Sequence, residues 1–414
     1  GPVSVGFGVV YRKETYVYVT NADSSPGGYM STRNVRDFPK AGLSVKEVYA
    51  ETIVPLLAEN SVIGSLDFNG AARLTDYSVS GTVTTWKAGL TAKPISGIML
   101  RGTISRDIRA PSLTELFTAS VPSVPAPSIS DLRPAFANQA SYSYDAVSGG
   151  NVNLKPEIAR TISYGVVFNP NFLSRLQLSL DFYKIKIRDA IGSTSSGNIL
   201  TNCMGTGVAD PSNPYCSLVS FANNDPVSGR VLRVISNNAN FAEFKTSGID
   251  IGVSYVQPME DVIPGMSGRL SFSAQATHVQ EYRSTFDISP LFPNGVNRAG
   301  QTGATFGGTA GLPSWFVNST IAYRGSKFEA SIQHRWISKS RQNKGYVGPD
   351  DTNYNSTVTN SINNNIVPAV GYVNTSMSYN FGTSDNRREV FLTINNLFDK
   401  APPLPAINNN AYYD

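Results

Sequence analysis

The sequence predicts an all-β protein, and two observations lead to this fold class: the composition and the period of the hydrophobic pattern. Charged residues make up 15% of the 414 residues, against about 25% in an ordinary soluble domain. Glycine, tyrosine and phenylalanine are abundant, at 35, 20 and 20 residues. Asn/Ser/Thr-rich gaps separate the apolar segments, which is typical of short strands joined by turns and loops.

Hydrophobic residues alternate with polar residues, and this alternation identifies the strands. In residues 64–77, one face carries Leu66, Phe68 and Leu74, and the other carries polar residues such as Asp67 and Arg73. This is a period of two, not the 3.6 of a helix. The same alternation recurs in residues 98–109, 175–182, 269–277 and 328–336.

The polar faces favour a transmembrane barrel over a soluble sandwich or solenoid. A soluble sandwich exposes its polar face to bulk water and is dense in Lys and Glu there. Here the polar faces are Ser, Thr, Asn, Gln and Gly with few charges, which suits a hydrated lumen. The apolar faces carry aromatic residues near the strand ends, as in a membrane-interface girdle; these are Phe182, Tyr183, Trp315, Trp336 and Phe381.

One strand makes the prediction specific. Leu178 and Leu180 should face lipid, and Ser179 and Asp181 should face the lumen. Beyond Phe182/Tyr183 the apolar residues change parity, which we interpret as the strand leaving the bilayer or forming a bulge.

Connector lengths support a barrel. We expect about 13 strands, at roughly 3–19, 44–58, 65–78, 81–94, 97–108, 159–169, 175–190, 230–257, 268–282, 314–325, 328–339, 370–382 and 388–399. Alternate connectors are short: 59–64, 93–97, 169–174, 325–327 and 382–387. The others are mostly long: 20–43, 109–158, 191–229, 283–313 and 340–369. Short turns on one side and long loops on the other are typical of outer-membrane barrels.

Several function classes are excluded. The 34 basic and 30 acidic residues leave a net charge of +4, spread along the chain, so we expect no nucleic-acid partner. No run of 18 apolar residues predicts a transmembrane helix, and we expect no signal peptide in this chain. His278 and His334 are isolated and no catalytic motif occurs, so the sequence does not predict an enzyme.

Five segments, in order along the chain, resemble the barrel of TonB-dependent outer-membrane receptors. They are GPVSVGFGVVYRKE (1–14), RGTISRDIRAPSLTELF (101–117), NLKPEIARTISYGVVF (153–168), KTSGIDIGVSY (245–255) and VFLTINNLFDKAPP (390–403). The resemblance implies a large, plugged barrel of 22 strands. Residues 1–414 would be the C-terminal portion of this single barrel domain, holding strands 9 to 21, without the plug domain and the last strand. An odd number of antiparallel strands also cannot close alone as a normal bacterial barrel.

The resemblance further implies active uptake of a scarce nutrient, such as a glycan, a peptide or a siderophore, across the outer membrane of a Gram-negative bacterium. The long loops would be extracellular. The partners would be outer-membrane lipid, the nutrient, and a TonB-type inner-membrane energy complex acting through the absent plug. Two alternatives remain open, a passive porin and a surface adhesin or binding module.

Within this framework we expect Cys203 and Cys216 to form a disulfide, because the outer face is oxidising and the bond closes a small loop. In the chain-entropy model such a loop contributes about 3 kcal/mol. Free thiols are the alternative.

Arg101, Asp107 and Arg109 project to one face of a strand, and Arg106 to the other. They could bind an anionic or polyhydroxylated ligand, or brace the wall against the plug, with Glu47 and Glu51 as possible partners of the arginines.

Four loop tyrosines, Tyr142, Tyr144, Tyr346 and Tyr354, could stack on a sugar ring or a siderophore or belong to ordinary loop packing, whereas Trp336 should anchor at the headgroup level. Residues 351–355 (DTNYN) mimic the start of a calcium loop, but Ser356 and Ile362 replace its Gly and Glu. We therefore expect no metal site and no cofactor.

Overall fold

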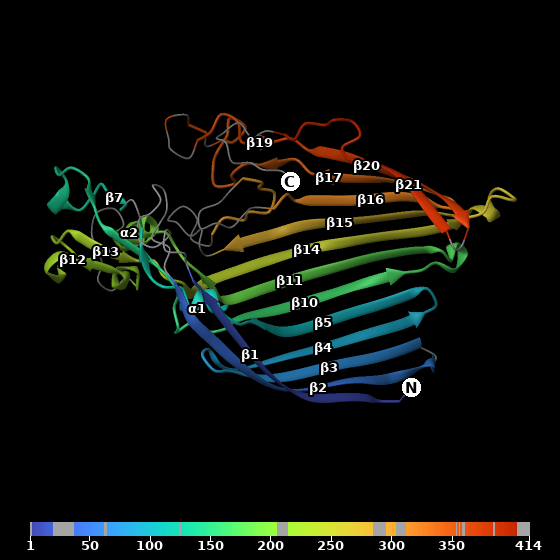
Figure 1. Ribbon diagram of the computed structural model, residues 1–414, viewed down its shortest axis with the longest axis horizontal. Coiled ribbons are helices and arrows are strands. Elements are labelled where there is room, and N and C mark those ends of the chain that lie inside the picture. Colours follow the sequence, from blue (N-terminus) through green and yellow to red (C-terminus); the bar gives the residue numbers. More distant parts are fainter. Residues whose placement is uncertain are drawn as a thin grey trace.

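Thirteen antiparallel strands form one curved sheet that makes up the body of the protein (Figure 1). The computed structural model describes residues 2–19, 37–61, 64–123, 126–204, 214–284, 295–303, 312–352, 354–355, 357, 361–383 and 386–403. Along the sheet, strands follow one another in chain order, and β1 and β21 form the two edges. The sheet is therefore an open section of a barrel wall.

The thirteen strands confirm the predicted number. They are β1 (Ser4–Tyr18), β2 (Phe38–Ser61), β3 (Gly64–Tyr77), β4 (Gly81–Ile95), β5 (Ile98–Arg109), β10 (Glu157–Phe168), β11 (Leu176–Gly192), β14 (Ala239–Pro258), β15 (Arg269–Ser284), β16 (Trp315–Arg324), β17 (Phe328–Ile337), β20 (Val370–Thr383) and β21 (Asn386–Ile394). One expected strand, 230–257, is wrong as a single element. It divides into β13 (Val231–Ile235), which belongs to a different sheet, and β14.

Register assigns every residue to one of two faces. One cross-strand row runs Leu100–Val166–Leu180–Ile251, and the adjacent row runs Arg101–Gly165–Asp181–Asp250. The first row belongs to an apolar face on which Leu180 is 46% exposed, and we call this the outer face. The second row belongs to the polar lumen face. Trp336 lies on the outer face, opposite Val317 and Gly371.

Of the two interpretations of the parity change near Phe182/Tyr183, a β-bulge at that point is wrong, and departure of the strand from the bilayer stays a prediction. The register of β11 with β14 is continuous from Leu176 to Ile187, and the shifts come only around Ala190. Side chains therefore continue to alternate between the two faces without interruption. Lys184 and Lys186 lie on the outer face in line with Leu180, so the outer face changes from apolar to cationic here.

The two ends of the sheet differ. Short turns close one end, and at Gly97 (φ +82°) a side chain could not fit because its Cβ would lie 2.4 Å from the carbonyl oxygen of Asn169. The opposite end, the long-loop end, carries the remaining elements. They are α1 (Leu113–Phe117), β6 (Val121–Pro122), β7 (Ser128–Ile129), η1 (Pro134–Phe136), β8 (Tyr142–Ser143), β9 (Asp145–Ser148), α2 (Ser196–Met204), η3 (Pro214–Leu218), β12 (Val219–Phe221), η4 (Ala222–Asn224), β13, β18 (Ser340–Arg341) and β19 (Ile366–Val367). Two 3-10 turns, η2 (Asn171–Leu173) and η5 (Met259–Asp261), lie at the short-turn end.

Two long loops, residues 118–150 and 193–238, join to form a compact body that we call the lobe. Figure 1 shows the lobe projecting from the long-loop end, where its elements α2, β7, β12 and β13 are labelled. Its sheet has the order β12-β13-β9-β6 and thus takes strands from both loops. None of the helices within the described ranges is long and apolar enough to cross a membrane.

Candidate functional site

The lobe has its own hydrophobic core. Parallel pairing of β9 with β13 places Ala146 opposite Val234 and thereby joins the two loops. Buried side chains from both loops pack together under α2; they are Tyr144, Ala146, Ile199, Leu200, Cys203, Met204, Cys216, Val219, Phe221, Val231 and Val234. A loop with a packed core holds one shape, and that is what a surface that captures a ligand requires.

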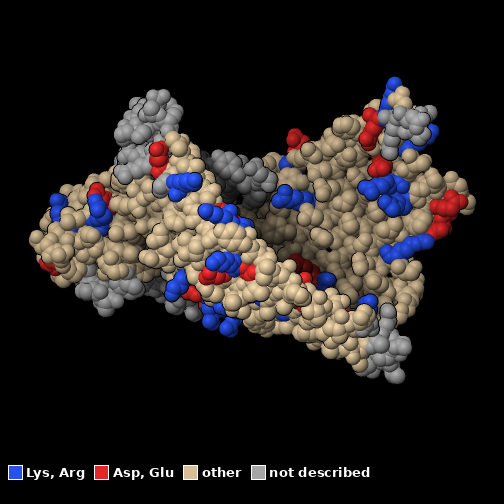
Figure 2. All heavy atoms as spheres, turned by 60° about the horizontal axis from the view of Figure 1, so that its bottom comes forward, with Lys and Arg blue, Asp and Glu red and all other residues tan. Residues whose placement is uncertain are grey.

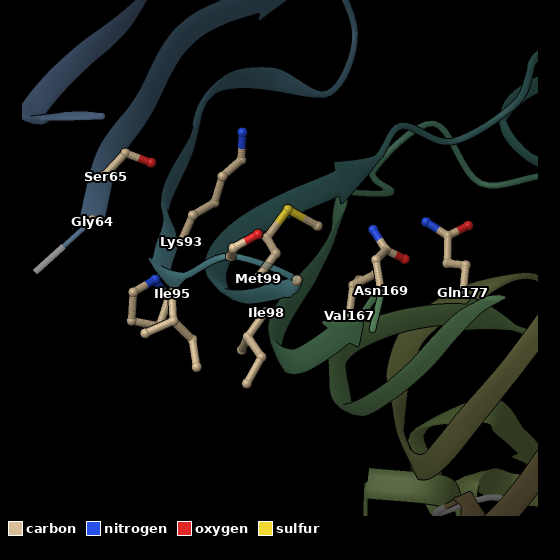
Figure 3. Close-up of a pocket in the computed structure, with 12 residues that line it drawn as sticks. Gly64, Ser65, Lys93, Ile95, Ile98, Met99, Val167, Asn169 and Gln177 are labelled. Atoms are coloured by element: carbon tan, nitrogen blue, oxygen red, sulfur yellow. The ribbon is translucent and has the colours of Figure 1, made fainter. Parts of the chain in front are cut away.

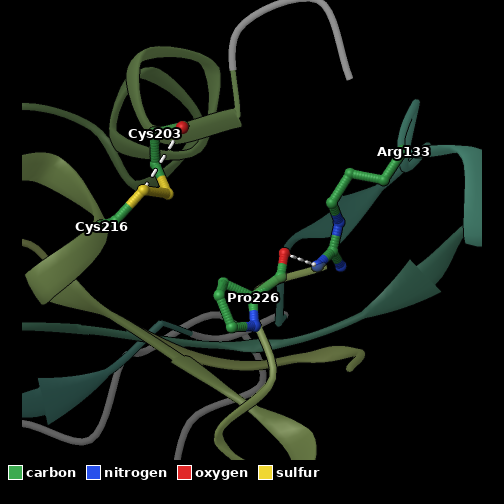
Figure 4. Close-up of a disulfide and its surroundings, with 4 residues drawn as sticks. All are labelled: Arg133, Cys203, Cys216 and Pro226. Carbon is green, nitrogen blue, oxygen red and sulfur yellow. Dashed lines mark hydrogen bonds between the residues drawn. A yellow bond between two sulfur atoms is a disulfide. The ribbon is translucent and has the colours of Figure 1, made fainter. Parts of the chain in front are cut away.

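A buried ion pair holds the lobe together. Arg133 is only 1% exposed, and its guanidinium donates to the two carboxylate oxygens of Asp131 at 2.9 and 2.5 Å. It also donates to the carbonyl oxygens of Pro226 and Gly229 at 2.8 and 2.9 Å, as Figure 4 shows for Pro226. The pair thus ties the first loop to the second by charge-assisted bonds.

Opposing effects set the pKa of the Asp131 carboxyl. Burial raises this pKa, but hydrogen bonds from Arg133 and Tyr142 outweigh burial and hold it below its ordinary value. Asp131 is therefore an anion in the folded lobe at neutral pH.

Cys203, at the end of α2, and Cys216 are joined by a disulfide with a Cα–Cα distance of 4.8 Å (Figure 4). Both cysteines are buried in the lobe core. Of the residues between them, 205–213 lie outside the described residues.

Tyr142 and Tyr144 lie inside the lobe. The Tyr142 hydroxyl donates to Asp131 at 2.6 Å and accepts from the backbone N–H of Val231 at 3.1 Å. Tyr144 is 5% exposed, and its hydroxyl is 3.0 Å from that of Ser196. The Tyr142 ring is partly buried, and the Arg230 guanidinium lies over it, 4.4 Å from the ring centroid.

Arg109 connects α1, the helix that leads into the lobe, to the barrel wall. Its guanidinium pairs with Glu157 at 2.7 Å and with Glu115 at 3.0 Å. Glu115 also closes a capping box with Ser112 at the start of α1, an arrangement that satisfies two backbone donors of the helix. Leu116 then packs against the wall below.

Arg101 and Asp107 lie on the lumen face with Arg109. Arg101 forms a two-bond pair with Asp181, at 2.7 and 2.5 Å. The pair spans Gly165, where a Cβ would come within 2.2 Å of the Asp181 carboxylate. Asp107 accepts from Ser105 at 2.6 Å. Figure 2 shows charged groups within the hollow of an otherwise mostly uncharged surface.

Glu47, predicted as a possible partner of Arg101 or Arg109, bonds other residues instead. Glu47 accepts from Thr75 at 3.0 Å and pairs with Arg73 at 3.5 Å, because these residues face it across the neighbouring strand. Glu51 lies on the lumen face beside Gly6.

Tyr346 and Tyr354 belong to a second cluster at the long-loop end, formed by residues 295–303 and 338–367. Its main ion pair joins Arg341 to Asp351 at 2.7 Å. The backbone N–H of Gly348 also donates to Asp351, so the first carboxylate of the calcium-like segment is already engaged. Asn353 of that segment lies outside the described residues.

Two of the cavities lie at opposite ends of the protein. One, of about 240 Å³, is in the lobe beside Leu132, Tyr144 and Thr201. The other, of about 670 Å³, is at the short-turn end of the lumen face. Figure 3 shows Lys93, Asn169 and Gln177 around this second cavity, on β4 and at the two ends of the β10–β11 turn.

The structure thus separates the predicted site residues into three places: the lobe core, the lumen wall and the second loop cluster. Sequence reasoning missed Asp131 and Arg133, because a D-x-R spacing in a loop carries no recognisable signal. Within the described residues, no group of three or more His, Cys, Asp or Glu side chains is arranged to hold a metal ion.

Comparisons with known proteins agree with this architecture. No curated protein matches the sequence. The siderophore receptor PirA from Acinetobacter baumannii has 16% identity and a TM-score of 0.59, covering 96% of this chain and 48% of the receptor. A ferric enterobactin receptor (PfeA) mutant from Pseudomonas aeruginosa, in complex with enterobactin, has 13% identity and a TM-score of 0.59, covering 96% and 46%. The FrpB iron transporter from Neisseria meningitidis has 14% identity and a TM-score of 0.52, covering 97% and 49%.

At these identities the likeness shows the fold, and the chain spans about half the length of these receptors. The family description "TonB dependent receptor-like, beta-barrel" matches residues 2–397, nearly the whole chain. The protein therefore belongs to the TonB-dependent receptor-like β-barrel family.

Proposed function

We propose that this chain forms the wall and ligand-capturing loops of an outer-membrane receptor that imports a scarce nutrient actively. The observation that carries the proposal is the lobe, in which two loops that strands β10 and β11 separate in sequence share one core at the end of a polar-lined wall. A preorganised lobe loses little conformational entropy when it binds. It therefore suits capture of a dilute ligand.

The nutrient would be a glycan, a peptide or a siderophore. Tyr346 and Tyr354, in the second loop cluster, would be the tyrosines that stack on a ring outside the lobe core. Arg101, Asp107 and Arg109 would form the polar path below. Arg101 and Arg109 are already paired with carboxylates. An anionic or hydroxyl-bearing ligand would therefore have to displace these carboxylates to bind the guanidinium groups.

The partners would be outer-membrane lipid around the outer face and a TonB-type energy complex acting through a plug domain. A plug would lie against the lumen face and cover the cavity at the short-turn end. In this orientation the lobe is extracellular.

Two alternative functions predict different behaviour. A passive porin would conduct ions constitutively, whereas an adhesin would bind its ligand at the surface and transport nothing. The full-length protein, incorporated into a planar bilayer, should be nearly silent until its plug is unfolded or removed. A large constitutive conductance would contradict active import and favour the porin.

Uptake separates an importer from an adhesin. Cells that express the full-length protein should accumulate one of three labelled probes, a ferric siderophore, an oligosaccharide or a peptide. Accumulation should stop when the proton gradient is dissipated, whereas surface binding should persist. Binding without any energy-dependent accumulation would contradict the proposal.

A further inference from the structure

Five cations form a single cross-strand row on the outer face. Register places each directly opposite the next; in order they are Arg106 (β5), Arg160 (β10), Lys186 (β11), Lys245 (β14) and Arg283 (β15). Lys184 and Arg188 flank the row two residues away on β11. We call these seven residues the cation belt. All of them lie toward the long-loop ends of their strands.

The belt lacks enough anions of its own. Like charges directly opposite each other in a sheet destabilise it. Glu243 pairs with Lys186 at 2.7 Å and with Lys245 at 2.8 Å, and Glu281 pairs with Arg283 at 3.1 Å. Seven cations less these two carboxylates leave a formal excess of +5.

Three members have no carboxylate partner among the described residues. The side chains of Arg160 and Lys184 make no ion pair or hydrogen bond with any residue that the structure describes, and the Arg106 side chain donates to the backbone carbonyl of Thr84. A row of neighbouring cations whose two members on β5 and β10, Arg106 and Arg160, lack a carboxylate partner is an arrangement that an external anion would stabilise.

The surface next to the belt is apolar. On the side toward the short turns, the rings of Tyr164 and Phe182 meet with centroids 5.0 Å apart. Beyond them the outer face continues through Leu100 and Leu180, which are about half exposed. A ligand that covers both regions must have an anionic head and an apolar tail.

We propose that the cation belt binds the phosphorylated headgroup of a lipid in the leaflet at the long-loop end, with the acyl chains lying along the apolar outer face. Arginine forks and lysines together suit phosphate oxygens. Four inter-strand steps of about 4.8 Å make the row about 19 Å long. This is wide enough for a headgroup with more than one phosphate. The inference rests on the membrane position proposed above.

The test uses the full-length protein, purified in detergent and freed of lipid. It is titrated with bis-phosphorylated lipid A or with phosphatidylcholine, and bound lipid is measured by native mass spectrometry. The variant Arg160→Gln/Lys186→Gln removes two belt cations. The control Lys87→Gln/Lys93→Gln removes the same charge from β4, where both lysines lie on the lumen face. Heat-dependent gel mobility checks that each barrel is folded.

Near a membrane surface each such cation contributes about 1 kcal/mol. Loss of two cations should therefore weaken lipid A binding about 30-fold, at 1.4 kcal/mol per tenfold. The control should bind as the wild type does, and phosphatidylcholine should bind weakly to all three proteins. Inorganic pyrophosphate, added as a competitor, should displace little lipid.

Three results would overturn the inference: a belt variant that binds lipid A as tightly as the wild type, a control that loses as much affinity as the belt variant, or pyrophosphate that binds as tightly as the lipid. The last would identify a soluble anion as the ligand. Nutrient uptake is not a readout here, so failure of this inference and failure of the proposed import remain distinguishable.

Discussion

Substituting Arg133 tests whether the lobe is a rigid body. Arg133→Met keeps a side chain of similar length but removes the guanidinium that bonds Asp131 and the carbonyl oxygens of Pro226 and Gly229. The Asp131 carboxylate would stay buried, with Tyr142 as its remaining side-chain donor.

Removing one partner of a buried ion pair costs about 3–5 kcal/mol. At 1.4 kcal/mol per tenfold, the locally opened population of the lobe should rise about a hundredfold to a few thousandfold. Amide hydrogen exchange of β12 and β13, measured in the full-length protein, should accelerate accordingly. Exchange in β10 should not change, because its pairing with β5 and β11 does not involve Arg133.

Arg233→Met is the matched control. Arg233 also pairs with an aspartate in the lobe, Asp145, but both side chains are more than half exposed. An exposed pair contributes about 0–1 kcal/mol, so exchange should accelerate only slightly. The double variant Asp131→Leu/Arg133→Met should recover much of the protection, because no buried charge then lacks a partner. Equal exchange in Arg133→Met and wild type would refute the reasoning.

Three further predictions concern the lobe and its orientation. Cys203→Ser/Cys216→Ser should leave the folded barrel intact by heat-dependent gel mobility but make α2 sensitive to protease; a barrel that fails to assemble would contradict this. Because the pKa of Asp131 is lowered in the folded lobe, its contribution to stability should be complete above about pH 4 and lost as pH falls below that value; hydrogen-exchange protection factors of the lobe, corrected for the intrinsic rate at each pH, that stay unchanged down to pH 3 would contradict this. A cysteine at Ser220, exposed in the lobe, should react with an impermeant maleimide on intact cells, and one at Ser326, exposed at a short turn, should not; the opposite pattern would reverse the proposed orientation.

The strands could be predicted from the sequence because a barrel wall repeats one simple rule. Each strand needs apolar residues at every second position, and this rule predicted both the thirteen strands and the faces of Leu180 and Asp181. The rule fails where the outer face is no longer apolar. Beyond Phe182 the outer face becomes cationic, so Ile185 and Ile187 suggested a bulge that the register does not contain.

The lobe could not be predicted in the same way. Its sheet pairs β9 with β13, almost 90 residues apart, and its parallel pairing has no local turn to reveal it. Residues 230–257 therefore read as one strand, although the chain leaves the lobe at Ile235 and enters the wall at Ala239. Likewise, nothing in the loop sequence shows that Arg133 is buried. The cation belt requires the register of five strands before its members can be seen as neighbours.

The central claim is that the chain is a membrane wall with one face in lipid, and labels at two adjacent residues test it most directly. Leu178 lies on the outer face and Ser179 on the lumen face. Arginine at Leu178 should impair assembly, because a cation on the lipid face costs about 2–4 kcal/mol near the midplane. A soluble sandwich would show a similar asymmetry.

A fluorophore at each position, in full-length protein reconstituted into bilayers, removes this ambiguity. A lipid-soluble quencher should strongly reduce emission from the label at Leu178 and reduce it much less at Ser179. A third label, at Lys184, where the outer face reaches the cation belt, should be quenched less than the label at Leu178. Equal quenching at Leu178 and Ser179 would contradict the assignment of this chain as a membrane barrel wall.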